Sequence, residues 1–148
     1  MRGRLAAQVF LVSMGIAGSG MATDLKAVTA EPNLEKRSEK AIGNAGTALD
    51  AARAGYLAGD KEKFNAGLEE LLASVELAKK SLDESGKNAR RSPKYFKKAE
   101  ISLRKLNLRI DNFRIEVSVE DRGGIAKILE RSVHIRDELL DAIMGKQK

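Results

Sequence analysis

The chain has 148 residues with no cysteine, one histidine and a formal net charge of +6 at pH 7. Without cysteine there is neither a disulfide framework nor a thiolate metal site, so packing has to supply the stability. Aromatic residues make up only 4% of the chain, while Ala, Leu, Lys and Glu abound. This composition is typical of a helical bundle and argues against a surface that stacks sugars or bases.

The first 22 residues are predicted to be a cleaved signal peptide. Arg2 and Arg4 form a short basic head, an apolar run follows over residues 5–18, and Gly20-Met21-Ala22 offers small residues to a peptidase. The apolar run is shorter than the roughly 20 residues that span a bilayer. We therefore expect an exported protein, periplasmic or secreted, with no transmembrane anchor in the mature chain.

Residues 23–32 show no sustained period and are predicted to be a flexible leader. Pro32 keeps the residue before it out of a helix, and Asn33 is placed to cap the first predicted helix. From Leu34 to about Ala58, small residues recur in steps of three and four, which indicates a helix that lets a neighbouring backbone approach closely. These small residues are Ser38, Ala41, Ala45, Ala48, Ala52 and Gly55.

A second helix is predicted after Gly59-Asp60, because glycine ends one helix and aspartate caps the next. Its apolar seam has a four-three spacing, and Gly86 ends it. The seam consists of Phe64, Leu68, Leu71, Val75, Ala78 and Leu82. After a basic loop, Ser92-Pro93 is predicted to start the next helix, with serine as the cap and proline in the first turn.

The third segment has two interpretations. A three-four seam runs over 22 residues, through Phe96, Ala99, Leu103, Leu106, Ile110, Phe113 and Val117. The stretch 106–119 also alternates every second residue around Asp111-Asn112, which is the pattern of a β-hairpin. The hairpin would require the helix to stop near Lys105 without Gly or Pro. We favour a continuous helix and keep an α+β fold with a hairpin at 106–119 as the alternative.

A fourth helix is predicted after Ser118, which forms a capping-box pattern with Asp121, and it ends at Gly145 before a basic tail of residues 146–148. Its apolar positions are Ile125, Ile128, Leu129, Val133, Ile135, Leu139, Leu140 and Ile143. Short links between four similar helices dictate antiparallel neighbours. The predicted fold class is therefore all-α, an up-down-up-down four-helix bundle over residues 33–145.

Positive charge is concentrated in one region. Residues 79–109 carry eleven Lys or Arg and three Asp or Glu, a net of +8, so the remaining residues total −2. The candidate anion- or partner-binding residues crowd one end of the predicted hairpin of helices two and three. They are Lys87, Arg90, Arg91, Lys94, Lys97 and Lys98. This end would attract an anionic partner, and the alternative is a surface that only keeps the protein soluble.

A second candidate surface is apolar. If the third segment is helical, Ile101, Leu108 and Ile115 fall seven residues apart on the side opposite its seam. Burying each of these side chains would stabilise the protein by roughly 1.5–3 kcal/mol relative to leaving it in water. We expect them to be covered by the leader around Leu25 and Val28, by a second copy of the chain, or by a separate partner.

No catalytic or metal-binding constellation is evident. His134, the only histidine, lies on the polar side of the fourth helix, and one imidazole without Cys or a second His is a poor transition-metal site. The chain has no phosphate-binding loop and no nucleophile with a partner base. We therefore expect a non-enzyme without a cofactor, and with no catalytic, cofactor-binding or metal-binding residues.

Three stretches resemble small, uncharacterised exported bacterial proteins of about this length. They are RSPKYFKKAEISLRKL at 91–106, EDR at 120–122 and IRDELLDAIMG at 135–145. The resemblance covers the C-terminal third of the chain. It implies a helical exported module and carries over no established activity.

The function expected from the sequence is that of an exported, non-catalytic helical binding module of the cell envelope. It would act through a protein partner or through self-association. One alternative is a periplasmic chaperone-like bundle that shields apolar clients. Another is a structural protein that associates with anionic envelope polymers through the basic region. Nucleic acid is not an expected partner, because an exported protein seldom meets it.

Overall fold

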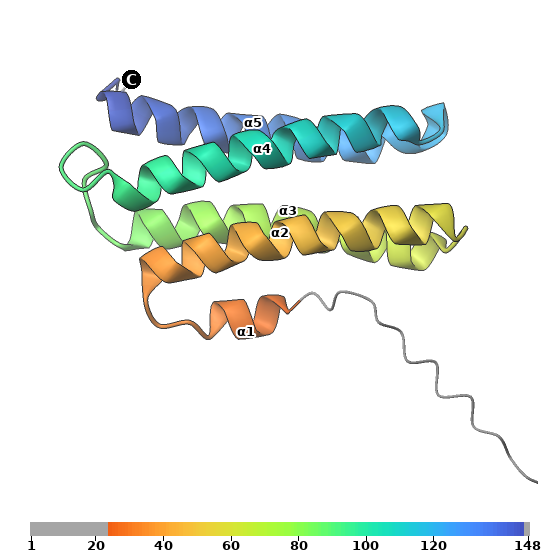
Figure 1. The fold of residues 1–148 in the computed structure, drawn as a ribbon, viewed down its shortest axis with the longest axis horizontal. Coiled ribbons are helices and arrows are strands. Elements are labelled where there is room, and N and C mark those ends of the chain that lie inside the picture. The colour runs from red at the N-terminus through yellow and green to blue at the C-terminus, as the bar shows by residue number, and fades with distance from the viewer. Residues whose placement is uncertain (1–23, 147–148) are drawn as a thin grey trace, which may run out of the picture.

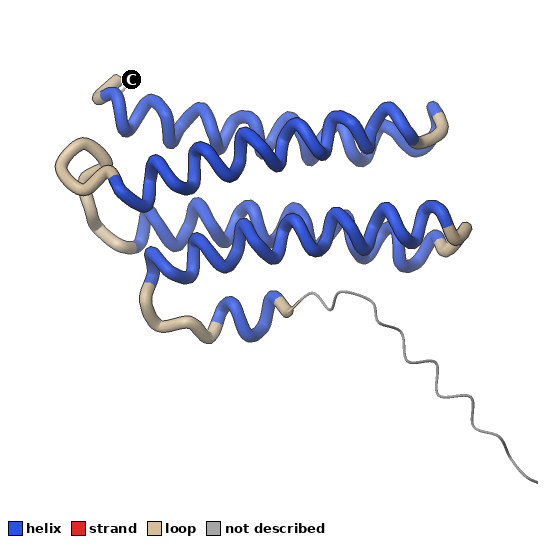
Figure 2. Tube along the Cα trace, viewed as in Figure 1, coloured by secondary structure: helices blue, strands red, loops and turns tan. Residues whose placement is uncertain are grey.

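The computed structural model describes residues 24–146, which form five α-helices and one short 3-10 helix and contain no strand. The helices are α1 (Leu25–Thr29), α2 (Leu34–Leu57), α3 (Lys61–Glu84), α4 (Lys94–Glu116), η1 (Val119–Asp121) and α5 (Arg122–Met144). Figure 2 shows helices connected only by turns and loops. The all-α prediction is confirmed, and the hairpin alternative at 106–119 is wrong, because α4 continues through Asp111 and Asn112. The predicted signal peptide lies outside the described residues.

The four long helices pack as two antiparallel hairpins, α2–α3 and α4–α5, laid one on the other (Figure 1). Each long helix runs antiparallel to the next along the chain, so α4 starts at the same end of the bundle as α2. Helix α1 packs against α2 and α3, on the side of that hairpin away from α4 and α5 (Figure 1).

Local sequence signals fix most helix ends. The side chains of Asn33 and Asp60 each accept a hydrogen bond from the backbone N–H three residues later, at 2.9 and 3.1 Å. Gly59, Gly86 and Gly145 have φ values of +71°, +66° and +74°, a conformation that favours glycine and ends a helix. These starts and stops are therefore those that the sequence predicts.

Two predicted caps are wrong. Helix α4 follows Pro93 without a side-chain cap, because Ser92 belongs to a turn in which its N–H donates to the carbonyl of Asn88 at 2.8 Å. The Ser118 hydroxyl donates to the Asp121 carboxylate at 2.8 Å instead of capping a backbone N–H. That turn is η1, and α5 begins only after it.

The segment expected to be a flexible leader holds α1, which is docked. Val28 is buried against the bundle. The N–H of Asp24 donates to Oδ1 of Asn44 at 2.9 Å, and the N–H of Leu25 donates to Oε1 of Glu70 at 3.3 Å. A helix of five residues is too short for a 3.6-residue period to show in the sequence, which is why the prediction missed it.

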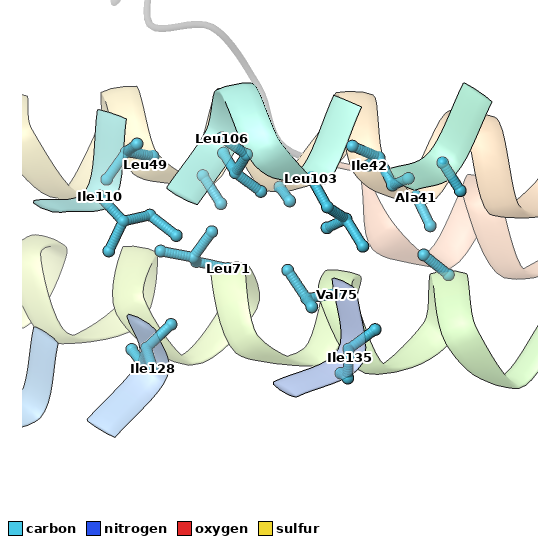
Figure 3. Packing of buried hydrophobic residues seen from close by; sticks show 14 of the residues in the cluster. Ala41, Ile42, Leu49, Leu71, Val75, Leu103, Leu106, Ile110, Ile128 and Ile135 are labelled. Atoms are coloured by element: carbon cyan, nitrogen blue, oxygen red, sulfur yellow. The ribbon is translucent and has the colours of Figure 1, made fainter. Parts of the chain in front are cut away.

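The predicted seams meet in one core. Figure 3 shows Leu71 and Val75 of α3 facing Leu103 and Ile110 of α4, with Ile135 of α5 closing the same interior. Every residue of the predicted seams on the second and third predicted helices is buried. The core therefore follows the predicted register of α3 and α4.

One core position on α5 differs from the prediction. Val133 is 39% exposed, whereas its neighbour Ser132 is fully buried and its hydroxyl donates to Oδ1 of Asn107 on α4. Burial of a hydrogen-bonded polar pair avoids the cost of an unpaired polar group.

Lys146, the one described residue of the tail, donates its N–H to the carbonyl of Asp141 at 2.9 Å.

Helices α2 and α3 approach more closely than side chains usually allow. A Cβ atom on Gly67 would lie 2.7 Å from the backbone nitrogen of Ala52, and a Cβ on Gly55 would lie 2.6 Å from that of Phe64. Gly55 of α2 and Gly67 of α3 are thus required by the contact between the two backbones. This confirms the close approach that the small residues of α2 predict.

The variant Gly67→Ala is expected to lower the free energy of unfolding by about 1–3 kcal/mol, because the added methyl group meets the α2 backbone. Gly43→Ala is the matched control. Its Cβ has no neighbour within 4 Å, so it should gain up to about 1 kcal/mol of helix propensity. Urea denaturation followed by circular dichroism measures both. Equal effects at the two glycines would contradict the close approach.

A bidentate ion pair links the two hairpins. Both carboxylate oxygens of Glu76 on α3 accept from the guanidinium of Arg131 on α5, with Nη2 to Oε2 at 3.0 Å. This hydrogen bond from Arg131 lowers the pKa of Glu76 below its usual 4.5. A carboxyl group with a depressed pKa stabilises the fold at pH values above its unfolded pKa, and the contribution disappears as pH falls through the folded pKa.

We expect Glu76→Gln to destabilise the protein by no more than about 1 kcal/mol at pH 7, because both side chains are partly exposed. The difference from wild type should vanish at a pH below the folded pKa of Glu76. Urea denaturation of both proteins at a series of pH values from 7 downward measures this. A destabilisation that does not shrink as the pH falls would show that the charge of Glu76 is not its cause.

Candidate functional site

The loop between α3 and α4 is shaped by Asn88. Its side-chain oxygen accepts from the N–H of Arg90 at 2.9 Å and from that of Arg91 at 3.2 Å. This turn places both arginines just before the first turn of α4. Sequence reasoning passed over Asn88, although asparagine in a loop commonly bonds to the backbone two residues later in this way.

The structure gathers the six predicted cations at one end of the bundle. Lys87, Arg90 and Arg91 lie on this loop, the other three lie on the first turns of α4, and all six are exposed. We call this group (Lys87, Arg90, Arg91, Lys94, Lys97 and Lys98) the basic end.

Two cations of the basic end are neutralised by α2. Lys87 pairs with Glu35, and Nζ of Lys98 lies 2.6 Å from Oε1 of Glu39. Sequence reasoning missed both acids because they are distant in the chain and meet the cations only through the packing of α2 beside α4. The positive charge of this end is therefore smaller than the sequence count indicates.

The other four cations, Arg90, Arg91, Lys94 and Lys97, form no ion pair with any residue between 24 and 146. The Lys94 ammonium lies 5.3 Å from the centre of the Tyr95 ring. These four side chains leave uncompensated positive charge at the surface.

Arg90 also borders a hollow between the loop and the end of α5. Its side chain lies against Gly145, where a Cβ atom would come within 2.8 Å of Cδ of Arg90. The hollow has a volume of about 570 Å³, and Lys87 and Asn88 line it together with Arg90. Asp83, the acid on its wall, is held by Lys79 at 2.6 Å. The basic end thus combines a polar hollow with cations on its rim.

The predicted apolar face lies on the outer side of α4. Ile101, Leu108 and Ile115 are 43%, 64% and 59% exposed, and we call them the apolar stripe. Helix α1, one of the expected covers, packs on α2 and α3 instead. The three residues are exposed on one side of α4, as the sequence predicts, and no residue between 24 and 146 buries them.

A groove that the sequence analysis did not anticipate runs between α2 and α4. It has a volume of about 450 Å³ and an apolar floor that includes Ile42, Ala99 and Leu106. Gly43 and Gly46 on α2 leave room for it. Its wall includes Ser38, whose buried hydroxyl has no hydrogen-bond partner among the described residues.

Several titratable groups outside the basic end form internal pairs. His134 is exposed, with Nε2 3.2 Å from the Glu138 carboxylate. The buried Glu100 accepts from Arg136 at 2.9 Å and from Arg104 at 3.2 Å, so both its oxygens are occupied. No group of three or more His, Asp or Glu side chains in the described part of the chain could hold a metal ion.

No protein-family model, curated protein or solved structure matches the chain. Similarity therefore assigns it no activity. No helix between residues 24 and 146 is both long enough and apolar enough to cross a membrane.

Proposed function

We propose that this protein is a non-catalytic helical binding module of the cell envelope, and that its basic end binds a polyanion such as a phosphate-rich envelope polymer. The supporting observation is the group of four exposed cations, Arg90, Arg91, Lys94 and Lys97, that have no acidic partner within the described chain. The envelope location rests on the signal-peptide pattern of residues 1–22.

Unpaired cations favour such a partner for two physical reasons. Polyanions hold condensed counterions, and their release on binding supplies a driving force that weakens with added salt. Arginine also presents a planar fork of donors that matches phosphate oxygens. Asn88 fixes the turn that carries Arg90 and Arg91, so binding orders less of this loop. The loss of conformational entropy on binding is therefore smaller.

The double variant Arg91→Ala/Lys94→Ala is expected to weaken binding to long-chain inorganic polyphosphate by about thirtyfold at low salt, since each cation near an anionic surface contributes about 1 kcal/mol. Wild-type affinity should fall steeply between 50 and 200 mM salt, and the salt dependence should be shallower in the variant. Fluorescence titration with labelled polyphosphate measures both.

The matched control is Lys61→Ala/Lys127→Ala, which removes the same charge at the opposite end of the bundle. This control should bind nearly as wild type does. Equal weakening in the two double variants would mean that only net charge matters and would refute a localised site.

A further inference from the structure

The groove between α2 and α4 has an ion pair near each end. The two helices run in the same direction (Figure 1). Nζ of Lys98 lies 2.6 Å from Oε1 of Glu39. At the other end, Nη2 of Arg109 lies 2.5 Å from Oδ1 of Asp50. Each pair joins residues 59 positions apart in the chain, and about 16 Å of helix axis separates the two acids on α2.

Between these two ion pairs, one cation has no acid opposite it. Lys105 of α4 borders the groove, is exposed and forms no ion pair with any residue between 24 and 146. By the same spacing of 59 residues, the position opposite Lys105 on α2 is Gly46. Gly43 also borders the groove, and an added Cβ there would meet nothing within 4 Å. The middle of the groove therefore has an uncompensated positive charge opposite two glycines.

The rest of the lining is neutralised or apolar. The floor includes Ile42, Ala99 and Leu106, and the volume of about 450 Å³ is in the usual range of small-molecule sites. Such sites combine an apolar lining with a few polar groups that orient the ligand. Every other charged side chain that borders the groove is ion-paired: Glu35, Glu39, Lys98 and Arg109.

We propose that this groove binds a medium-chain fatty carboxylate. Its carboxylate pairs with the Lys105 ammonium, at the one place in the row of ion pairs where α2 has no acid. Its alkyl chain lies along the apolar floor, over Ile42 and Leu106. A linear chain fits because the groove is long and narrow, between two helices that run in the same direction.

Charge and floor together favour this ligand over other classes. A polyanion would place several charges over apolar side chains, where each charge loses its hydration. A cationic amphiphile would be repelled by Lys105, and a neutral one would leave its charge uncompensated. The proposal is independent of polyanion binding, because the four unpaired cations of the basic end do not border the groove: Arg90, Arg91, Lys94 and Lys97.

A series of chain lengths tests the role of the floor. A fully buried CH₂ group would raise the affinity about fourfold, and in a groove that is open to solvent beside Gly43 we expect about twofold. Isothermal titration calorimetry with hexanoate, octanoate, decanoate and laurate, each below its critical micelle concentration, measures this increase. An affinity that does not depend on chain length would overturn the proposal.

NMR titration with laurate tests the place of binding. The backbone amides of Gly43 and Gly46 should shift, because both residues border the groove. Those of Gly123 and Gly124, in the first turn of α5, should stay in place, because neither borders it. Absence of any shift at Gly43 and Gly46 up to the solubility limit of laurate would overturn the proposal.

Lys105→Ala tests the role of the charge. It is expected to weaken laurate binding about fivefold and to leave the binding of 1-dodecanol unchanged, because the alcohol carries no charge. The matched control is Lys127→Ala, which removes the same charge from an exposed position of α5. Equal losses for laurate and dodecanol in Lys105→Ala would show that the carboxylate does not contact Lys105.

Gly43→Glu supplies an acid on the side of the groove where α2 has none. The new carboxylate competes with the ligand for Lys105 and repels it, so laurate binding should weaken about tenfold or more. Gly123→Glu is the matched control, because it adds the same side chain at an exposed helical glycine with no neighbour within 4 Å. Circular dichroism verifies that both variants remain folded.

Two further results would overturn the proposal. One is equal weakening of laurate binding in Gly43→Glu and Gly123→Glu, which would mean that only net charge matters. The other is a ligand-free protein that sediments as a dimer and becomes monomeric in Gly43→Glu, which would assign the groove to a second copy of the chain.

Discussion

Helix α4 buries a continuous apolar seam, from Phe96 to Phe113, against α2, α3 and α5, and this burial joins the two hairpins. The period that turns the seam inward also turns Ile101 and Leu108 outward, because they lie on the opposite side of the same helix. Lys97 projects from its early turns, so one helix supplies core, apolar stripe and part of the basic end. Both surfaces therefore depend on the unbroken helical course of α4.

The two contacts of α2 differ in closeness. Against α3, Gly67 lets the backbones meet and leaves no room for a side chain. Against α4, Gly43 borders an open groove, and contact is completed by ion pairs such as Lys98 with Glu39. The α2–α3 hairpin is therefore the tightly packed part of the fold, while α4 presents its charges and its apolar stripe to solvent.

The sequence predicted the features that depend on local chemistry and failed where tertiary contacts decide. The seam of α4 repeats regularly and no Gly or Pro interrupts it, which sufficed to identify a helix. The sequence does not predict helix α1, because contacts with α2 and α3 hold this short segment in place and the local sequence does not show them. Ser132 lies in the core in place of the predicted Val133, because its hydroxyl bonds to Asn107. The hydrophobic periodicity of the sequence does not reveal such a contact. The neutralising role of Glu35 likewise appears only when α2 packs near the loop.

Native-state hydrogen exchange across α4 tests most directly whether this helix is continuous. A continuous helix predicts that the amides of Asp111 and Asn112 are protected to a degree similar to those of Leu106 and Ile110, because each donates within the same ladder. Rapid exchange confined to Asp111 and Asn112, with slow exchange on both sides, would indicate a turn between two strands. That result would contradict the burial of the seam and both surfaces that depend on it.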